Sequence, residues 1–173
     1  MRRFLALACL ALLGFASLFV GVIDLRPGDL LTDRAALEVL LLSRVPRLCA
    51  VLITGAALAV AGTVMQALVR NRFVEPMTVG TGQGAALGIL IVTFAIPAAP
   101  LLVRMGGAAI TAFLASLGFL LIAQRLPPTQ PFLVALVGLI YGGIIGAVVT
   151  FVAYQADLLQ YIDIWMNGEF SAV

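Results

Sequence analysis

Long apolar stretches alternate with short polar segments along the whole chain. Five such stretches, each about 20 residues long, cover residues 4–23, 48–69, 77–96, 101–122 and 132–154. A helix of that length crosses the hydrocarbon core of a bilayer and satisfies its own backbone hydrogen bonds there. The pattern therefore predicts an all-α membrane protein with about five transmembrane helices.

The first stretch follows Arg2 and Arg3 and therefore also fits a secretory signal peptide. Its apolar run is about twice as long as a usual signal-peptide core, and no clear small-x-small cleavage pattern precedes Asp24. We therefore predict a retained first helix and keep the signal peptide as the alternative.

Two polar segments are long enough to hold structure of their own. Residues 24–47 contain a Pro-Gly turn and then an apolar set at Leu37, Leu40 and Leu41, which predicts a short surface helix. Residues 155–173 predict an external loop or an interfacial helix, because Tyr161 and Trp165 suit the boundary between membrane and water.

Composition narrows the chemistry. The chain is 63% hydrophobic and 10% charged, whereas soluble domains carry about 25% charged residues. All ten basic residues are arginines, and neither lysine nor histidine occurs, which excludes a Walker A loop, histidine-ligated metals and histidine-based catalysis. Cys9 and Cys49 lie in or beside apolar runs and are interpreted as small core residues. No catalytic residue, metal site, cofactor or nucleic-acid partner is expected.

Charges are absent from the middle of every predicted span. Arg104, near the start of the fourth, is expected to reach the membrane surface with its guanidinium. The absence of intramembrane carboxylates argues against a proton-coupled transporter. With the N-terminus inside the cell, five arginines fall on each side of the membrane, so the positive-inside rule does not decide the orientation. The doublet before the first helix favours a cytoplasmic N-terminus.

Small residues recur at four-residue spacing in three of the predicted helices. This spacing places them on one helix face, which permits either tight packing or a wall of a translocation path. Gln66 is likewise either an interhelical hydrogen-bonding residue or a pathway residue. The positions open to both interpretations are Gly55, Gly62, Gln66, Gly80, Gly84, Gly138, Gly142 and Gly146, and Ala108, Ala112 and Ser116 share the same spacing.

A short turn separates the second and third predicted helices. It contains Arg70, Asn71, Glu75 and Pro76. A plain membrane turn is one interpretation, and a partner-docking surface supported by a buried Arg70–Glu75 pair is the other.

An ordered run of motifs from Arg44 to Gly88 resembles the permease subunits of ABC importers for iron-siderophores, haem and cobalamin, the FecCD-type family. The Trp-x-x-Gly segment that begins at Trp165 also fits this family. The run consists of Arg44-Val45-Pro46-Arg47-Leu48, Gly55-Ala56-Ala57-Leu58-Ala59, Gly62-Thr63-Val64-Met65-Gln66, Arg70-Asn71, Glu75-Pro76, Gly80 and Gly82-Gln83-Gly84-Ala85-Ala86-Leu87-Gly88.

The resemblance implies a permease of the bacterial cytoplasmic membrane with a cytoplasmic N-terminus. It also implies a second permease copy or paralogue, cytoplasmic ATPase subunits that hydrolyse ATP, and an extracytoplasmic substrate-binding protein. Arg44 and Arg47 would then be the residues that dock the binding protein, and the fifth helix would border the pathway. The substrate class is an iron-siderophore, haem or a related metal-chelate, and the chain itself would be no enzyme.

Two features depart from the family pattern. Arg72 stands where the family's turn has a proline, and the chain has about five helices where the family has about ten in two halves of opposite orientation. We therefore interpret the chain as the N-terminal half of a type II permease, either truncated or naturally split. A structural or assembly subunit without a transport path is the alternative function.

Overall fold

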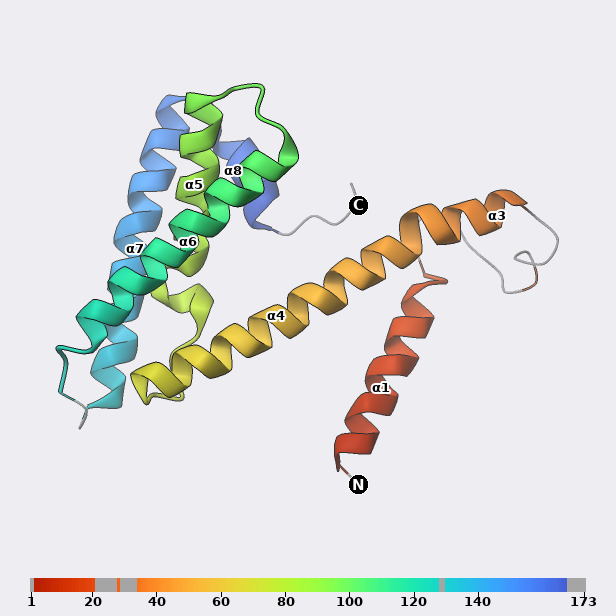
Figure 1. Cartoon of the computed structure of the whole chain (residues 1–173), viewed down its shortest axis with the longest axis horizontal. Helices are drawn as coiled ribbons and strands as arrows, with labels where there is room; N and C mark the ends of the chain where they lie inside the picture. Colours follow the sequence, from red (N-terminus) through yellow and green to blue (C-terminus); the bar gives the residue numbers. More distant parts are fainter. Residues whose placement is uncertain (1, 21–27, 29–33, 128–129, 168–173) are drawn as a thin grey trace. The chain divides into compact units, whose positions relative to one another are not determined.

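A computed structural model of the chain describes residues 2–20, 28, 34–127 and 130–167 (Figure 1). All the regular structure in these residues is helical, which confirms the predicted fold class. The chain divides into two compact units, one of residues up to Ala56 and one of Ala57–Glu169.

The first unit begins with helix α1 (Arg2–Ser17). This helix ends six residues earlier than the predicted limit at residue 23. Two tight turns follow it, with backbone N–H groups of Leu18 and Phe19 donating to the carbonyls of Phe15 and Ala16. Residues 21–27 of the predicted stretch and its following turn lie outside the described residues.

The predicted surface helix is present as α3 (Arg34–Val39), but it is not separate from the second span. A π-helical turn (Leu40–Arg44) joins it to α4 (Val45–Val69), so that Arg34–Val69 is one continuous helical segment. The π turn has a physical cause in Pro46, which has no N–H to donate and whose ring crowds the preceding turn. The N–H of Val45 instead reaches five residues back to the carbonyl of Leu40.

The second unit contains the last turns of α4 and five further elements. The third predicted helix is broken, because a 3₁₀ turn, η2 (Pro76–Val79), precedes α5 (Thr81–Ala95). Gly80 makes the break with φ of 90°, a left-handed conformation that glycine adopts without a steric penalty. Helices α6 (Leu101–Ala123) and α7 (Pro131–Gln155) follow with ends close to the predicted ones, and α8 (Leu159–Met166) lies in the predicted C-terminal segment.

Helix α5 lies at the centre of the second unit, where it packs against α6, α7 and α8 (Figure 1). Two buried clusters hold the unit together. One is centred on Phe119 and Val79, and the other on Ile89, Ala153 and Ile162. Within the described residues, three helical segments are long and apolar enough to cross a membrane. They are Arg34–Val69, Leu101–Ala123 and Phe132–Gln155, and two shorter apolar helices are Phe4–Ser17 and Thr81–Ala95.

Candidate functional site

The break at Gly80 lies directly against α7. A methyl group built on Gly142 would lie 3.0 Å from the backbone nitrogen of Gly80, and one built on Gly80 would lie 3.1 Å from the ring of Tyr141. Both glycines are buried. A side chain at either position would therefore push the two backbones apart.

The other two glycines of the predicted α7 face also meet the α5 segment. Gly138 packs against Val79, and Gly146 faces the side chain of Gln83. Gly143, beside this face, has no atom within 4 Å of an added methyl group. The four-residue spacing in α7 thus coincides with one packing face within the second unit.

Helices α5 and α6 approach each other even more closely. A methyl group on Gly84 would lie 2.5 Å from the Cβ of Ala115, and one on Gly88 would overlap the hydroxyl of Thr111 and the carbonyl of Gly107. Small residues on both helices permit this backbone contact.

Four polar side chains lie within the α5–α6–α7 bundle, and three of them form hydrogen bonds between its helices. The hydroxyls of Thr81 and Ser116 are 2.7 Å apart and share a hydrogen bond. The phenol of Tyr141 donates to the carbonyl of Ala115 at 2.9 Å. The Oε1 atom of Gln83 is buried without a hydrogen-bond partner among the described residues. It is therefore a candidate acceptor for a donor that the described residues do not contain.

Helix α8 is held to the start of α6 by Arg104. Its guanidinium donates to the Tyr161 hydroxyl at 2.7 Å and to the Pro97 carbonyl at 2.9 Å, and it lies 5.6 Å from the Tyr161 ring centroid. Tyr161 in turn makes an edge contact with Trp165. The sequence pattern predicted that Arg104 would reach the membrane surface, but it held no signal for a partner 57 positions away.

The exposed and mostly polar face of α8 carries Gln160, Asp163 and the apolar Ile164, and Asn167 follows at its end. The opposite face buries Ile162 against the second cluster. Because α8 packs beside α5, this places a carboxylate next to the apolar bundle. The sequence pattern did not single out Asp163, since it lies beyond the last long apolar stretch.

The turn after α4 is organised by Arg70 and Asn71. Arg70 has φ of 54°, and the N–H of Asn71 donates to the carbonyl of Gln66 at 3.1 Å, which is the Schellman ending of a helix. Asn71 is buried, and its side-chain oxygen accepts from the N–H of Phe73. Arg70 and Glu75 are both exposed, so this structure does not contain the buried Arg70–Glu75 pair on which one of the two interpretations of the turn depends.

The remaining predicted residues are placed as follows. Pro76 is buried and lies near Gly62, and the amide nitrogen of Gln66 donates to the carbonyl of Arg72. The side chain of Gln66 therefore forms a hydrogen bond within the turn that follows its own helix. In the first unit, Gly55 has open space around it.

The two arginines predicted to dock a binding protein flank the junction between the π turn and α4. Arg44 donates to the carbonyl of Val20, whereas Arg47 is exposed. Among the described residues, no group of three or more Cys, Asp or Glu side chains is arranged to hold a metal ion.

Comparison with known proteins covers nearly the whole chain. It is 38% identical over 98% of its length to the petrobactin import system permease protein FatD of Bacillus anthracis, of which it covers 49%. It is 38% identical over 95% of its length to the petrobactin permease YclN of Bacillus subtilis, covering 52% of that protein. It is 37% identical over 99% of its length to the vitamin B12 permease BtuC of Escherichia coli, covering 53%.

The chain thus spans about half the length of the curated relatives it matches. The sequence pattern that defines the FecCD transport family matches residues 9–173. With its helical architecture and its run of motifs from Arg44 to Gly88, this chain belongs to the FecCD transport family.

Proposed function

We propose that this chain is part of the membrane-spanning permease of an ABC importer that carries an iron-siderophore, haem or a related metal-chelate into the cell. The observation that carries the proposal is the similarity to import permeases across 95–99% of the chain. Two of those relatives are named for petrobactin and one for vitamin B12. ATP would be hydrolysed by a separate subunit.

The pathway would be bordered by α7 and α8. The glycine face of α7 is occupied by α5 within this unit, so the exposed side of α7 and the polar face of α8 are the surfaces available to a passing substrate. Polar side chains beside a bundle of membrane helices normally face water or another polar group. Gln160, Asp163 and Asn167 are therefore the residues that we assign to the wall of the path.

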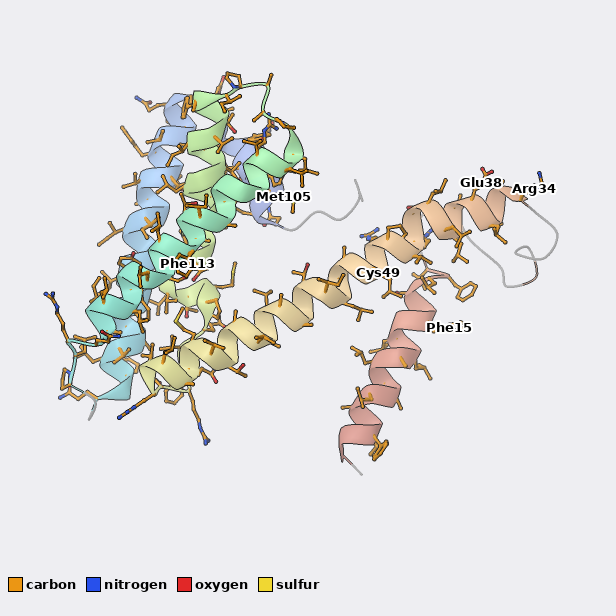
Figure 2. The ribbon with its side chains drawn as sticks, viewed as in Figure 1. Phe15, Arg34, Glu38, Cys49, Met105 and Phe113 are labelled. Carbon is orange, nitrogen blue, oxygen red and sulfur yellow. The ribbon has the colours of Figure 1, made fainter. Side chains whose placement is uncertain are left out.

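Arg47 is the stronger of the two docking candidates, because Arg44 also donates to the Val20 carbonyl. Charge pairs at the rim of an interface steer and orient a partner more than they hold it. We expect Arg47→Glu to weaken binding of the substrate-binding protein roughly tenfold at low salt. The matched control is Arg34→Glu, an exposed arginine of α3 (Figure 2). If both variants bind with the affinity of the wild type, Arg47 is not part of the interface.

A cytoplasmic N-terminus is part of the proposal, and cysteine labelling tests it directly. With Cys9 and Cys49 replaced by serine, single cysteines are introduced by Ala98→Cys, between α5 and α6, and by Arg72→Cys, after α4. Both positions are exposed. A membrane-impermeant maleimide added to intact cells should label position 98, and label position 72 only after permeabilisation. The reverse labelling pattern would show that the N-terminus lies outside the cell.

The function itself is tested by assembly. The chain is co-expressed with a polypeptide that supplies the other half of the relatives' length, with candidate ATPase subunits and with a binding protein. Co-purification of the ATPase, and ATP hydrolysis that increases on adding the loaded binding protein, are the expected results. Stable association without stimulated hydrolysis would favour a structural or assembly subunit, and no association would count against both.

A further inference from the structure

Two neighbouring cavities lie between α6 and the last turns of α4, both within the second unit. One has a volume of about 280 Å³ and an almost wholly apolar lining, to which Phe113 (Figure 2) and Leu117 of α6 contribute. The other has a volume of about 320 Å³ and is lined by Arg70, Asn71 and Gln124 as well as by apolar side chains.

The two cavities adjoin each other, because both are lined by Leu68 of α4 and Leu120 of α6, and together they are called the groove below. The apolar part lies along the preceding turns of both helices, and the polar part lies where both helices end. The end of a membrane-crossing helix is where hydrocarbon gives way to headgroups and water. The change from apolar to polar along the groove therefore follows the depth of a bilayer.

Polar groups in the apolar part are already satisfied. Thr81 and Ser116 line it, but their hydroxyls bond to each other. A long apolar chain thus meets no unpaired polar atom there. An apolar helix would fill this part equally well, but it would leave the charged end unmatched.

The polar end carries a positive charge, because Arg70 is one of the residues that line it. Arg70 is in the left-handed region with φ of 54°, where glycine is the usual residue. Keeping an arginine there costs free energy that a glycine avoids, and its side chain is long enough for the guanidinium to reach a ligand in the cavity. Guanidinium groups bind phosphate oxygens in a bidentate manner. The unbonded carbonyls at the last turn of a helix accept hydrogen bonds from amine or hydroxyl groups.

We propose that this groove binds one phospholipid of the surrounding membrane, with its phosphate on Arg70, its headgroup donors near Asn71 and Gln124, and an acyl chain beside Leu117. The inference needs only that the chain lies in a bilayer. It does not rest on the proposed transport function, and its failure would leave that function untouched.

Lipid retention tests the charged end. The whole chain is reconstituted in nanodiscs of phosphatidylethanolamine and phosphatidylglycerol, extracted with mild detergent, and analysed by native mass spectrometry for bound phospholipid. Arg70→Gly removes the guanidinium and also relieves the backbone, so loss of folding is not the expected outcome. Retained lipid should fall about tenfold. The matched control is Arg125→Gly, an exposed arginine after α6 that does not line the cavity, and its lipid content should equal that of the wild type.

A second pair of variants tests the apolar end. Leu117→Trp fills the groove and should lower lipid retention several-fold. Leu114→Trp, one turn away on α6, places the same ring on an exposed position outside the groove lining and should leave retention unchanged. Both substitutions add the same bulk to an exposed leucine of one helix.

A measurement on the wild type keeps the proposal testable without any variant. A phospholipid with a photoreactive acyl chain should label α6 most strongly around Phe113 and Leu117. Uniform labelling of all exposed helix faces, or equal lipid retention by Arg70→Gly and Arg125→Gly, would show only surrounding bulk lipid and overturn the proposal. Covalent capture of a polypeptide in place of lipid by a photoreactive side chain at position 117 would also overturn it, since a protein helix would then occupy the groove.

Discussion

Helix α5 and the part of α4 after Ala56 have similar compositions but opposite surroundings. Both are rich in glycine, alanine and aliphatic residues. In α5, Gly82, Gly84, Ala86, Gly88, Ile89 and Leu90 are buried, whereas only Met65 is buried in α4. The difference lies in what faces the small residues. Gly84 and Gly88 meet small residues and a hydroxyl of α6, while Gly62 has only the Pro76 ring nearby.

Apolar character alone does not decide between these two outcomes. Lipid tails are as apolar as leucine, so helices in a membrane associate through close packing and hydrogen bonds. A glycine therefore contributes to association only where a facing backbone comes near enough to use the missing side chain. Substitutions at individual glycines therefore distinguish packed positions from open ones.

The largest effect is expected at the α5–α6 contact. Gly88→Ala would place a methyl group on the Thr111 hydroxyl and the Gly107 carbonyl, both of which belong to the facing helix. We expect a loss of about 3 kcal/mol in the free energy of unfolding, because backbone atoms must move to accept the methyl group. Denaturation in mixed micelles measures it.

The control for this substitution lies in the same helix pair. Gly106→Ala, in α6, meets no atom within 4 Å. It should be neutral, or stabilising by up to about 1 kcal/mol because alanine favours a helix more than glycine does. Equal losses at positions 88 and 106 would refute close packing as the reason for the burial of α5.

A smaller effect is expected at the attachment of α8. Arg104→Gln removes two charge-assisted hydrogen bonds and the contact with the Tyr161 ring. We expect a loss of about 2 kcal/mol, together with faster hydrogen exchange in α8. Tyr161→Phe keeps the ring and should show less than half of this loss. Unchanged exchange in α8 for Arg104→Gln would mean that buried Ile162 alone holds the helix.

The α5–α7 contact should be less sensitive. A methyl group on Gly142 would lie 3.0 Å from backbone atoms of Gly80, whereas one on the neighbouring Gly143 meets open space. We expect Gly142→Ala to cost about 1 kcal/mol after the gain in helix propensity is subtracted. Gly143→Ala should not be destabilising in the same denaturation assay, and a larger loss at 143 than at 142 would contradict the assigned packing face.

The smallest effect is expected from a single hydrogen bond. Tyr141→Phe removes the bond to the Ala115 carbonyl but keeps the ring against Phe119. Hydrogen bonds between membrane helices are worth about 0.6 kcal/mol on average, and the free energy of unfolding should fall by that amount. A loss as large as that of Gly88→Ala would show that Tyr141, and not the close packing at the glycines, makes the main stabilising contact.

The sequence predicted the features that depend on apolar length. Helices α6 and α7 end within a residue or two of their predicted limits, because proline and charged residues bound long apolar runs. The break at Gly80 was not predicted. In the sequence Gly80 looks like the nearby Gly82, Gly84 and Gly88, and it differs from them in its positive φ, which only the structure shows. Pro46 did carry a signal for the π turn, because a proline inside a helix must displace a hydrogen bond.

The candidate site was less accessible from the sequence. Spacing identified the α7 face of Gly138, Gly142 and Gly146, but it does not say what occupies that face. Arg104 and Tyr161 are brought together only by the way α8 folds back on the bundle. The groove that Arg70 helps to line is formed by α4 and α6, which are distant in sequence, so no local sequence pattern could predict it.

ATP-dependent uptake in proteoliposomes is the most direct test of the proposed import function. The vesicles contain this chain, a polypeptide that supplies the other half of the relatives' length, and the proposed ATPase, with a binding protein loaded with radio-iron-labelled ferric siderophore. The account predicts accumulation that requires ATP and stops when the ATPase is made hydrolysis-deficient. Accumulation that continues without ATP, or none in a complex whose ATPase remains bound and active, would contradict the assignment of this chain to an import permease.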